Sequence, residues 1–275
     1  MIVNIIIGRH SNLSKELEKK LENVFLISTL DIEDELNKIS YKTFSKINII
    51  FNQFQASSKL YLLDDPINYI ERAIRSTAEV LNYIKTNNIN INKMIYTSSS
   101  SVYGNNISCL ESHNTQPLSL HASLKVSNEQ LIEKYCLDNN IDYTITRIFN
   151  MYGGNDSFSI ISKIINIYKT KKELVLINRG EAIRDFIHID DVVNSYIKIL
   201  LVSSVPVVNI GTSDGKSILY ILDYLRDNNL ILHTTEIKKN ELKVSISKNN
   251  ILLNILDKNY SFKKVEEYIL KKING

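Results

Sequence analysis

Residues 93–104, which read KMIYTSSSSVYG, constrain this chain more than any other stretch. The apolar run at residues 94–97 breaks into four consecutive serines, which indicates a β-strand that ends in a hydroxyl-rich loop. In a parallel α/β sheet, ligands bind beyond the carboxyl ends of the strands. The serine loop is therefore predicted to lie where ligands bind.

Apolar segments of strand length alternate with segments of helical periodicity along the chain. Asp65 and Pro66 suit the N-cap and first turn of a long helix. This alternation predicts an α/β fold with a Rossmann-like, doubly wound parallel sheet. Strands are expected at residues 3–7, 24–28, 47–51, 89–97, 143–149 and 207–211, and helices at residues 13–21, 65–84 and 119–136.

The predicted elements divide into a core and a smaller lobe. Residues 1–152 would form the core, and residues 183–211 would return to it with a further strand. Residues 153–182 and 212–275 contain helices and weaker strands, so they are expected to form a small C-terminal lobe.

Composition excludes several classes of protein. The net charge is only +3 and the basic residues are interspersed with acidic ones, so nucleic acid is not an expected partner, although an anionic substrate would suit this balance. No apolar run reaches the length of about 18 residues that a membrane helix needs. Cys109 and Cys136 form neither a metal nor a redox motif, which favours a reduced, cytoplasmic setting.

Three motifs together resemble those of the extended short-chain dehydrogenase/reductases, the NAD(P)-dependent epimerase/dehydratase family that acts on nucleotide sugars. Residues 98–104 are similar to its Ser-Ser-x-x-Val-Tyr-Gly signature, and residues 147–153 to its Arg-x-x-Asn-x-Tyr-Gly. Residues 184–192, RDFIHIDDV, are close to the family's RDFIHVDDV. The resemblance implies a dinucleotide-binding core, a substrate-binding lobe, a nucleotide-diphosphate sugar as ligand and a homodimer.

The family's catalytic groups correspond to Ser99, His121 and Lys125. By resemblance, Ser99 would hold a sugar oxygen and Lys125 the nicotinamide ribose, but the usual proton-passing tyrosine is His121. Lys125 lies four residues away on the same helix face and should favour a neutral imidazole. Three interpretations stay open: His121 is a substitute acid/base, a bystander in a slow or rewired enzyme, or the mark of an inactive site.

The family's glycine-rich cofactor turn reads here as Gly8-x-x-Ser11-x-x-Ser14, and the two serines are expected to crowd the site and weaken binding. No acidic residue ends the second predicted strand, and Asp31 comes slightly late. Arg9 and His10 could meet a 2′-phosphate, so the choice between NAD and NADP leans slightly to NADP. Further departures occur at Gln53-Phe54 and Ala73. The candidate cofactor residues are Gly8, Arg9, His10, Ser11, Asn12, Leu13 and Lys125.

On the substrate side the candidates are Ser99, Asn150 and Arg184, with Arg184 as the diphosphate contact. The family's second phosphate clamp is absent, and Lys243 is its nearest substitute. His188, Asp190 and Asp191 are expected to brace a helix, and no metal site is predicted.

These motifs favour an NAD(P)-dependent nucleotide-sugar 4-epimerase or 4-keto-reductase, such as those that make deoxysugars for surface polysaccharides. The alternative is a catalytically impaired protein of the same fold that still binds nucleotide sugars or dinucleotides. A nucleotide-sugar enzyme without a net redox step is a third reading. The sugar and the nucleotide base stay open.

Overall fold

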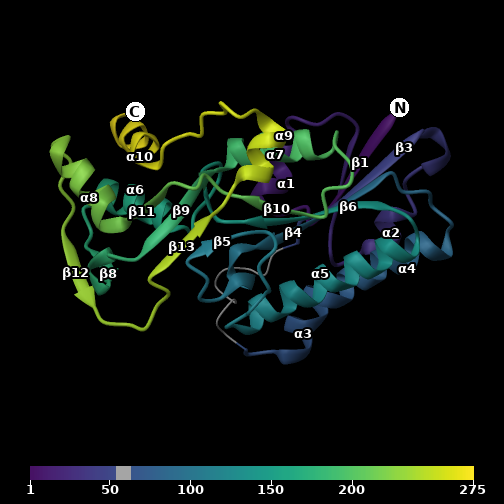
Figure 1. Ribbon diagram of the computed structural model, residues 1–275, viewed down its shortest axis with the longest axis horizontal. Coiled ribbons are helices and arrows are strands. Elements are labelled where there is room, and N and C mark those ends of the chain that lie inside the picture. The colour runs from purple at the N-terminus through teal and green to yellow at the C-terminus, as the bar shows by residue number, and fades with distance from the viewer. Residues whose placement is uncertain (54–62) are drawn as a thin grey trace. The chain divides into compact units, whose positions relative to one another are not determined.

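The computed structural model describes residues 1–53 and 63–275 of the chain (Figure 1). The chain folds into two compact units and crosses between them several times. The first unit holds Met1–Gly104, Thr115–Arg147 and Tyr196–Val208, and the second holds Asn105–Asn114, Ile148–Ser195 and Asn209–Gly275. Residues 153–182 and 212–275 thus belong to the second unit, together with residues 105–114, 148–152, 183–195 and 209–211, which were expected in the core.

A six-stranded sheet with the order β10-β6-β4-β3-β1-β2 forms the centre of the α/β fold, as the sequence predicted. β1 pairs in parallel with both β2 and β3, and β3 with β4. β1 and β3 are mostly apolar and buried along their length because helices cover both faces of a doubly wound sheet. The strands of this sheet are β1 (Ile2–Ile7), β2 (Val24–Ile27), β3 (Lys46–Phe51), β4 (Lys93–Ser99), β6 (Asp142–Ile148) and β10 (Val207–Ile210).

The helices of the first unit include α4 and α5, which run side by side (Figure 1). Asp65 caps its helix as predicted, because its carboxylate accepts the Asn68 amide at 3.0 Å. The single helix expected at residues 65–84 instead contains a π-helical turn, η3. The elements are α1 (Asn12–Glu18), α2 (Ile32–Leu36), η1 (Tyr41–Thr43), α3 (Pro66–Ile70), η3 (Glu71–Arg75), α4 (Ser76–Thr86), η4 (Ser100–Tyr103) and α5 (Leu120–Asp138).

Two element boundaries differ from prediction for local reasons. The fourth strand begins at Lys93 and not at Ile89, because the Ile89 amide donates to Ile84 and closes the end of α4. The helix expected at residues 13–21 ends at Glu18, where the amides of Lys20 and Leu21 both donate to the Leu17 carbonyl oxygen, at 3.0 and 2.9 Å. The core of the first unit contains Ile5, Ile49, Met94, Ile132 and Ile145.

The second unit contains a mixed sheet of order β11-β9-β13-β5, with β7 beside β9, and a two-stranded sheet of β8 and β12. Its core includes Tyr152, Phe186, Ile221 and Ile269. Its strands are β5 (Ser108–Cys109), β7 (Asn150–Tyr152), β8 (Leu174–Ile177), β9 (Ile183–His188), β11 (Gly215–Ser217), β12 (Thr234–Ile237) and β13 (Val244–Ser247). Its helices are α6 (Ile160–Thr170), η5 (Asn178–Gly180), α8 (Ile218–Asp227), α9 (Asn250–Leu256) and α10 (Val265–Asn274), while α7 (Ile189–Ile199) continues into the first unit. None of the helices in the described part of the chain has the length and apolarity needed to cross a membrane.

Candidate functional site

The turn after β1 depends on Gly8. Its φ is +112°, and a Cβ atom there would lie 2.5 Å from the Asn52 carbonyl oxygen. The amides of Gly8 and Arg9 both donate to the Ile27 carbonyl oxygen, at 2.9 and 3.0 Å. Only glycine tolerates both the dihedral angle and the close approach. The tight turn that a dinucleotide site requires is therefore present.

The two serines of this turn join it to β3. Ser14 is fully buried, and its hydroxyl donates to the Gly8 carbonyl oxygen at 2.8 Å. Nδ2 of Asn52 donates to Oγ of Ser14 at 2.9 Å and to Oγ of Ser11 at 3.2 Å. Ser11 occupies the N-cap position of α1 but makes no capping bond. Ser14 therefore packs inside the turn and does not crowd its outer surface.

The other predicted cofactor residues of the turn differ in exposure. His10 is exposed and Asn12 is half-buried, whereas the Leu13 side chain is completely buried. Since the Leu13 side chain is buried in the interior, only the backbone amide of this residue could contact a cofactor.

Arg9 is already engaged by the protein. Its Nε and Nη2 donate to the Leu26 carbonyl oxygen at 3.1 and 2.8 Å, and Nη2 lies 2.6 Å from Oε2 of Glu35. The slight preference for NADP that the sequence predicts depends on Arg9 and His10 contacting a 2′-phosphate. Because a carboxylate holds Arg9, that argument loses its main support. Sequence reasoning missed Glu35, since it lies on α2, a helix that was not predicted.

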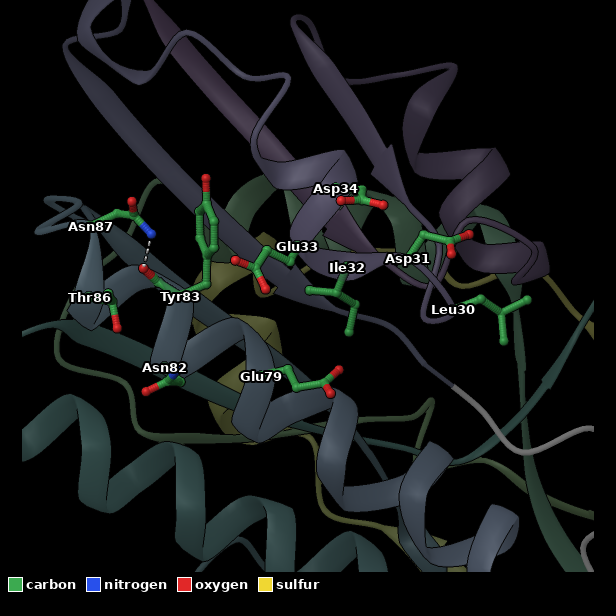
Figure 2. Close-up of a pocket in the computed structure, with 10 residues that line it drawn as sticks. All are labelled: Leu30, Asp31, Ile32, Glu33, Asp34, Glu79, Asn82, Tyr83, Thr86 and Asn87. Atoms are coloured by element: carbon green, nitrogen blue, oxygen red, sulfur yellow. Dashed lines mark hydrogen bonds between the residues drawn. The ribbon is translucent and has the colours of Figure 1, made fainter.

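An open groove of about 390 Å³ lies between α2 and α4 (Figure 2). Four carboxylates line it, from Asp31, Glu33, Asp34 and Glu79. Among residues 1–53 and 63–275, no group of three or more His, Cys, Asp or Glu side chains is arranged to hold a metal ion. The four carboxylates make the groove a surface of negative potential near the end of β2.

Lys125 is buried at the carboxyl edge of the sheet, with 5% of its surface exposed. Its Nζ donates to the carbonyl oxygens of Thr97 in β4, at 2.8 Å, and of Gln53 after β3, at 3.2 Å. Burial lowers the pKa of Lys125 to about 7, although Glu129 one turn later acts in the opposite direction. Lys125 can therefore gain or lose a proton near neutral pH.

His121 lies one turn before Lys125, and both line a cavity of about 20 Å³. Such a volume accommodates about one water molecule. Burial, and then the charge of Lys125, lower the pKa of His121 to about 4. His121 is therefore a neutral imidazole at physiological pH, which agrees with the expectation from its spacing to Lys125.

Two positions that depart from the family pattern, Gln53 and Ala73, also line the cavity. Gln53 donates to the Thr77 hydroxyl at 2.5 Å, and Asn128 donates to the Ala73 carbonyl oxygen in η3 at 2.7 Å. Within the described part of the chain, Oε1 of Gln53 and Oδ1 of Asn128 are buried without a hydrogen-bond donor. These two acceptors suit a bound water. Phe54, the other departing position, lies outside the described residues.

Ser99 lies at the end of β4 and caps η4. Its Oγ accepts the amide of Ser101 at 3.2 Å and the Ser101 hydroxyl at 3.0 Å, so its own hydroxyl can act as a donor. The structure brings His121 and Lys125 into one cavity, whereas Ser99 is not part of that lining. Ser99 follows Thr97, the Lys125 partner, by two residues.

A buried ion pair between Arg147 and Glu129 supports the serine loop; the sequence predicted that Arg147 braces the loop but did not identify Glu129 as its partner. Arg147 donates to both carboxylate oxygens of Glu129, at 3.1 and 2.7 Å, and lies 4.8 Å from the centre of the Tyr103 ring. The Ser98 hydroxyl also donates to Glu129. The i,i+4 spacing of Glu129 from Lys125 was the signal that could have identified it. Glu129 thus links the helix of Lys125 to the loop of Ser99.

In the second unit, the Asp185 carboxylate accepts several hydrogen bonds, a role that sequence reasoning also missed. It is fully buried and accepts from the amide and hydroxyl of Thr212, at 2.8 and 2.7 Å, and from those of Ser247, at 3.0 and 2.6 Å. The amide of Ser213 adds a fifth bond at 3.1 Å. Asn150 donates to the Asp185 carbonyl oxygen at 3.2 Å. Asp185 therefore fixes the strand that carries Arg184.

Arg184 faces a carboxylate and not open solvent. Its Nη1 donates to the Ile183 carbonyl oxygen at 2.9 Å, and its Nη2 lies 3.4 Å from Oε2 of Glu241, each side chain being 22% exposed. Burial lowers the pKa of Arg184, and Glu241 opposes this. Asn178 holds the other oxygen of Glu241 at 2.9 Å. Lys243, the expected clamp substitute, is exposed.

His188, Asp190 and Asp191 brace α7. Nδ1 of His188 accepts the Asp190 amide at 3.1 Å. Asp191 accepts the Tyr260 hydroxyl at 2.8 Å and the Lys263 amide at 3.0 Å. These contacts are structural, in keeping with the prediction.

Comparison with known proteins gives a family match over most of the chain. The model of the NAD dependent epimerase/dehydratase family matches residues 4–211. An uncharacterised protein of Methanocaldococcus jannaschii is 28% identical over 216 residues, which cover 76% of this chain and 65% of that protein. CDP-abequose synthase of Salmonella typhimurium is 32% identical over 153 residues, which cover 50% of this chain and 51% of that protein. The matched part thus spans about half to two thirds of these relatives' own length.

Solved structures match over nearly the full chain. UDP-glucuronic acid 4-epimerase from Bacillus cereus, in complex with UDP-glucuronic acid and NAD, has a TM-score of 0.80 at 21% identity and covers 99% of this chain and 98% of its own. UDP-glucose 4-epimerase of Thermotoga maritima has a TM-score of 0.81 at 19% identity, with the same coverage of both chains. At such identity these likenesses establish the fold. The comparisons lend no support to a non-catalytic binding protein.

Proposed function

Because this chain belongs to the NAD-dependent epimerase/dehydratase family, we propose that it is an NAD(P)-dependent enzyme that epimerises or reduces a nucleotide-diphosphate sugar. The observation that carries the proposal is the buried Lys125 beside His121 at the carboxyl edge of the sheet. Solved structures of the same fold bind NAD together with UDP-sugars, which supports this ligand class.

The residues of the first unit fit a nicotinamide dinucleotide. The Gly8 turn leaves room for close approach, because its tight packing is directed inward against Asn52. Ser11 accepts a bond from Asn52, so its hydroxyl can donate outward to a phosphate oxygen. Lys125 would orient the nicotinamide ribose. The cofactor, when bound, supplies or accepts the hydride.

The protein's own groups would hold the sugar oxygen and move its proton. Ser99 would donate a hydrogen bond to that oxygen. His121 stays neutral at physiological pH, because its pKa is about 4, and is therefore a weak base and a weak acid. Lys125, with a pKa of about 7, is the better proton reservoir in the cavity, and a water next to His121 would connect it to the sugar.

In the second unit, Arg184 would bind the diphosphate and Asn150 the nucleotide-sugar side. A guanidinium makes charge-assisted bonds to phosphate oxygens. Burial of Asp185 and its five hydrogen bonds would keep this strand in place.

Titration of the purified full chain with NADH and NADPH, followed by fluorescence and thermal shift, tests the proposal. We expect micromolar binding of one cofactor, and NADH oxidation or sugar epimerisation with a member of a nucleotide-sugar panel. Lys125→Met should weaken cofactor binding about tenfold or more. Lys134→Met is the matched control, since Lys134 lies exposed on the same helix. Absence of binding at millimolar cofactor would refute the proposal.

Replacement of His121 by Tyr decides among the three interpretations of that residue. If His121 is an evolved part of the site, turnover should fall. An increase in turnover would identify His121 as a defect, and unchanged turnover as a bystander. The measurement is the steady-state rate with the substrate found in the panel.

A further inference from the structure

We propose that Glu35, and not Asp31, recognises the adenosine ribose and makes this protein select NAD over NADP. The inference deepens the proposed function and depends on it. Ribose recognition in this fold uses a carboxylate near the end of the second strand. Asp31 follows β2 more closely in sequence, but the two carboxylates differ in how they are held.

Glu35 is fixed directly at the end of β2. Its Oε2 accepts the amide of Ser28, the first residue after β2, at 2.7 Å, and Nη2 of Arg9 at 2.6 Å. Its side chain is only 12% exposed. Glu35, which lies on α2, therefore places its carboxylate at the end of β2, next to Ser28. Such an anchored group is better suited to recognition than a mobile one, because its geometry does not have to be organised on binding.

Glu35 keeps the capacity to accept a ribose hydroxyl. Both of its donors bind Oε2, and a carboxylate offers about four acceptor positions over two oxygens. A hydrogen bond from a 2′-hydroxyl to a charged carboxylate is among the stronger neutral-to-ion contacts. A 2′-phosphate would instead present negative charge to the same group.

The surrounding charges also disfavour a 2′-phosphate. The first turn of α2 carries Glu33 and Asp34 as well as Glu35, and Figure 2 shows Asp31 just before them. Arg9 was expected to meet a 2′-phosphate, but Glu35 and the Leu26 carbonyl oxygen already hold its guanidinium. A phosphate there would have to separate Arg9 from Glu35 inside an acidic surface.

Asp31 provides a matched control. It occupies the N-cap position of α2 without making a capping bond, and it is exposed along the acidic groove. Asp31→Asn and Glu35→Gln each remove one negative charge near the end of β2. Only the second alters the anchored carboxylate, and glutamine preserves an acceptor for Ser28.

The experiment titrates the full-length wild type, Glu35→Gln, Glu35→Asp and Asp31→Asn with NADH and with NADPH by fluorescence, with thermal melting as a check of folding. The wild type and Asp31→Asn should both prefer NADH by about tenfold or more. Glu35→Gln should bring the two affinities to within about threefold. Glu35→Asp, which keeps the charge but shortens the reach, should weaken NADH while NADPH stays weak.

Each other outcome overturns the inference. A wild type that prefers NADPH, an unchanged ratio in a folded Glu35→Gln variant, or loss of selectivity in Asp31→Asn would each remove the role of Glu35 while leaving cofactor binding intact. If Glu35→Gln does not fold, the Glu35→Asp result decides. Failure of the wild type to bind either cofactor would refute the proposed function itself, and the inference with it.

Discussion

Two arginines that sequence analysis suggests for phosphate groups are each paired with a glutamate, but in different ways. Arg9 in the first unit lies 2.6 Å from Glu35 and makes two further bonds to the Leu26 carbonyl oxygen. Arg184 in the second unit lies 3.4 Å from Glu241 and has one bond to its neighbour's carbonyl oxygen. The first contact is short and the second exceeds the usual range of about 2.7–3.2 Å for a hydrogen bond.

The difference separates a fixed arginine from an exchangeable one. Glu35 also accepts the Ser28 amide, so the Arg9 pair is part of the connection between β2 and α2. The Arg184 pair joins β9 to the irregular segment before β13, and a phosphate could replace the carboxylate. We therefore expect the other partners of an arginine, and not its position in a motif alone, to decide whether it is available to a ligand.

Removal of Arg184 should have the largest effect on nucleotide binding. Arg184→Ala is expected to weaken UDP binding by about 10- to 100-fold, because charge-assisted bonds to phosphate are lost. NADH affinity should not change. Calorimetric titration with UDP measures this, and Arg179→Ala is the control, since Arg179 is 71% exposed and lies on η5. Equal losses in the two variants would exclude a specific role for Arg184.

A pH series should separate the two units. Because the pKa of Lys125 is about 7, its cation is lost above that pH, and NADH affinity should fall about tenfold per pH unit. UDP affinity should persist, since arginine keeps its charge. Burial lowers the pKa of Lys125 from 10.5 to about 7. Between these pH values Lys125 is therefore protonated in the unfolded chain and neutral in the folded chain.

The stability of the wild type relative to Lys125→Met should therefore rise with pH over that window, opposite in direction to cofactor affinity. Thermal melts of both proteins measure this difference. If the melting temperatures of the two proteins change in parallel from pH 7 to pH 10, Lys125 is not desolvated, in contradiction to the structure.

Loss of Arg9 should reduce stability more than loss of Arg184. Arg9→Ala removes three hydrogen bonds that connect β2 and α2, and we expect a loss of about 1 kcal/mol in unfolding free energy, limited by the 42% exposure of this side chain. Arg184→Ala should cost less than about 0.5 kcal/mol. Urea denaturation measures both, and the reverse order would contradict the distinction between fixed and exchangeable pairs.

The smallest effect is expected from Glu241→Gln. If Glu241 competes with phosphate for Arg184, neutralising it should strengthen UDP binding by about threefold, because a weak, partly exposed pair no longer has to be broken. Glu236→Gln is the control, as Glu236 pairs with Arg179 on the exposed side of the same unit. Weaker UDP binding in Glu241→Gln would indicate that Glu241 positions Arg184 for the ligand.

The local pattern of the chain was sufficient for the doubly wound sheet and for most of its elements. Largely apolar runs such as residues 47–51 reveal buried strands because both faces of a parallel sheet are covered. Asp65 and Pro66 reveal a helix start because capping is a local interaction. The short α2 escaped prediction, since a helix of one turn carries too little periodicity to be recognised.

The sequence by itself determined the fold and the family, through strand periodicity and through motifs whose residues are adjacent in the chain. Only the tertiary structure decided the state of the site: a buried Lys125, a His121 whose pKa burial lowers to about 4, and an Arg9 held by Glu35, 26 residues away. The physical reason is that burial and charge pairing depend on which segments meet in space. Desolvation and Coulomb energies are set by those distances, and the order of residues along the chain does not contain them.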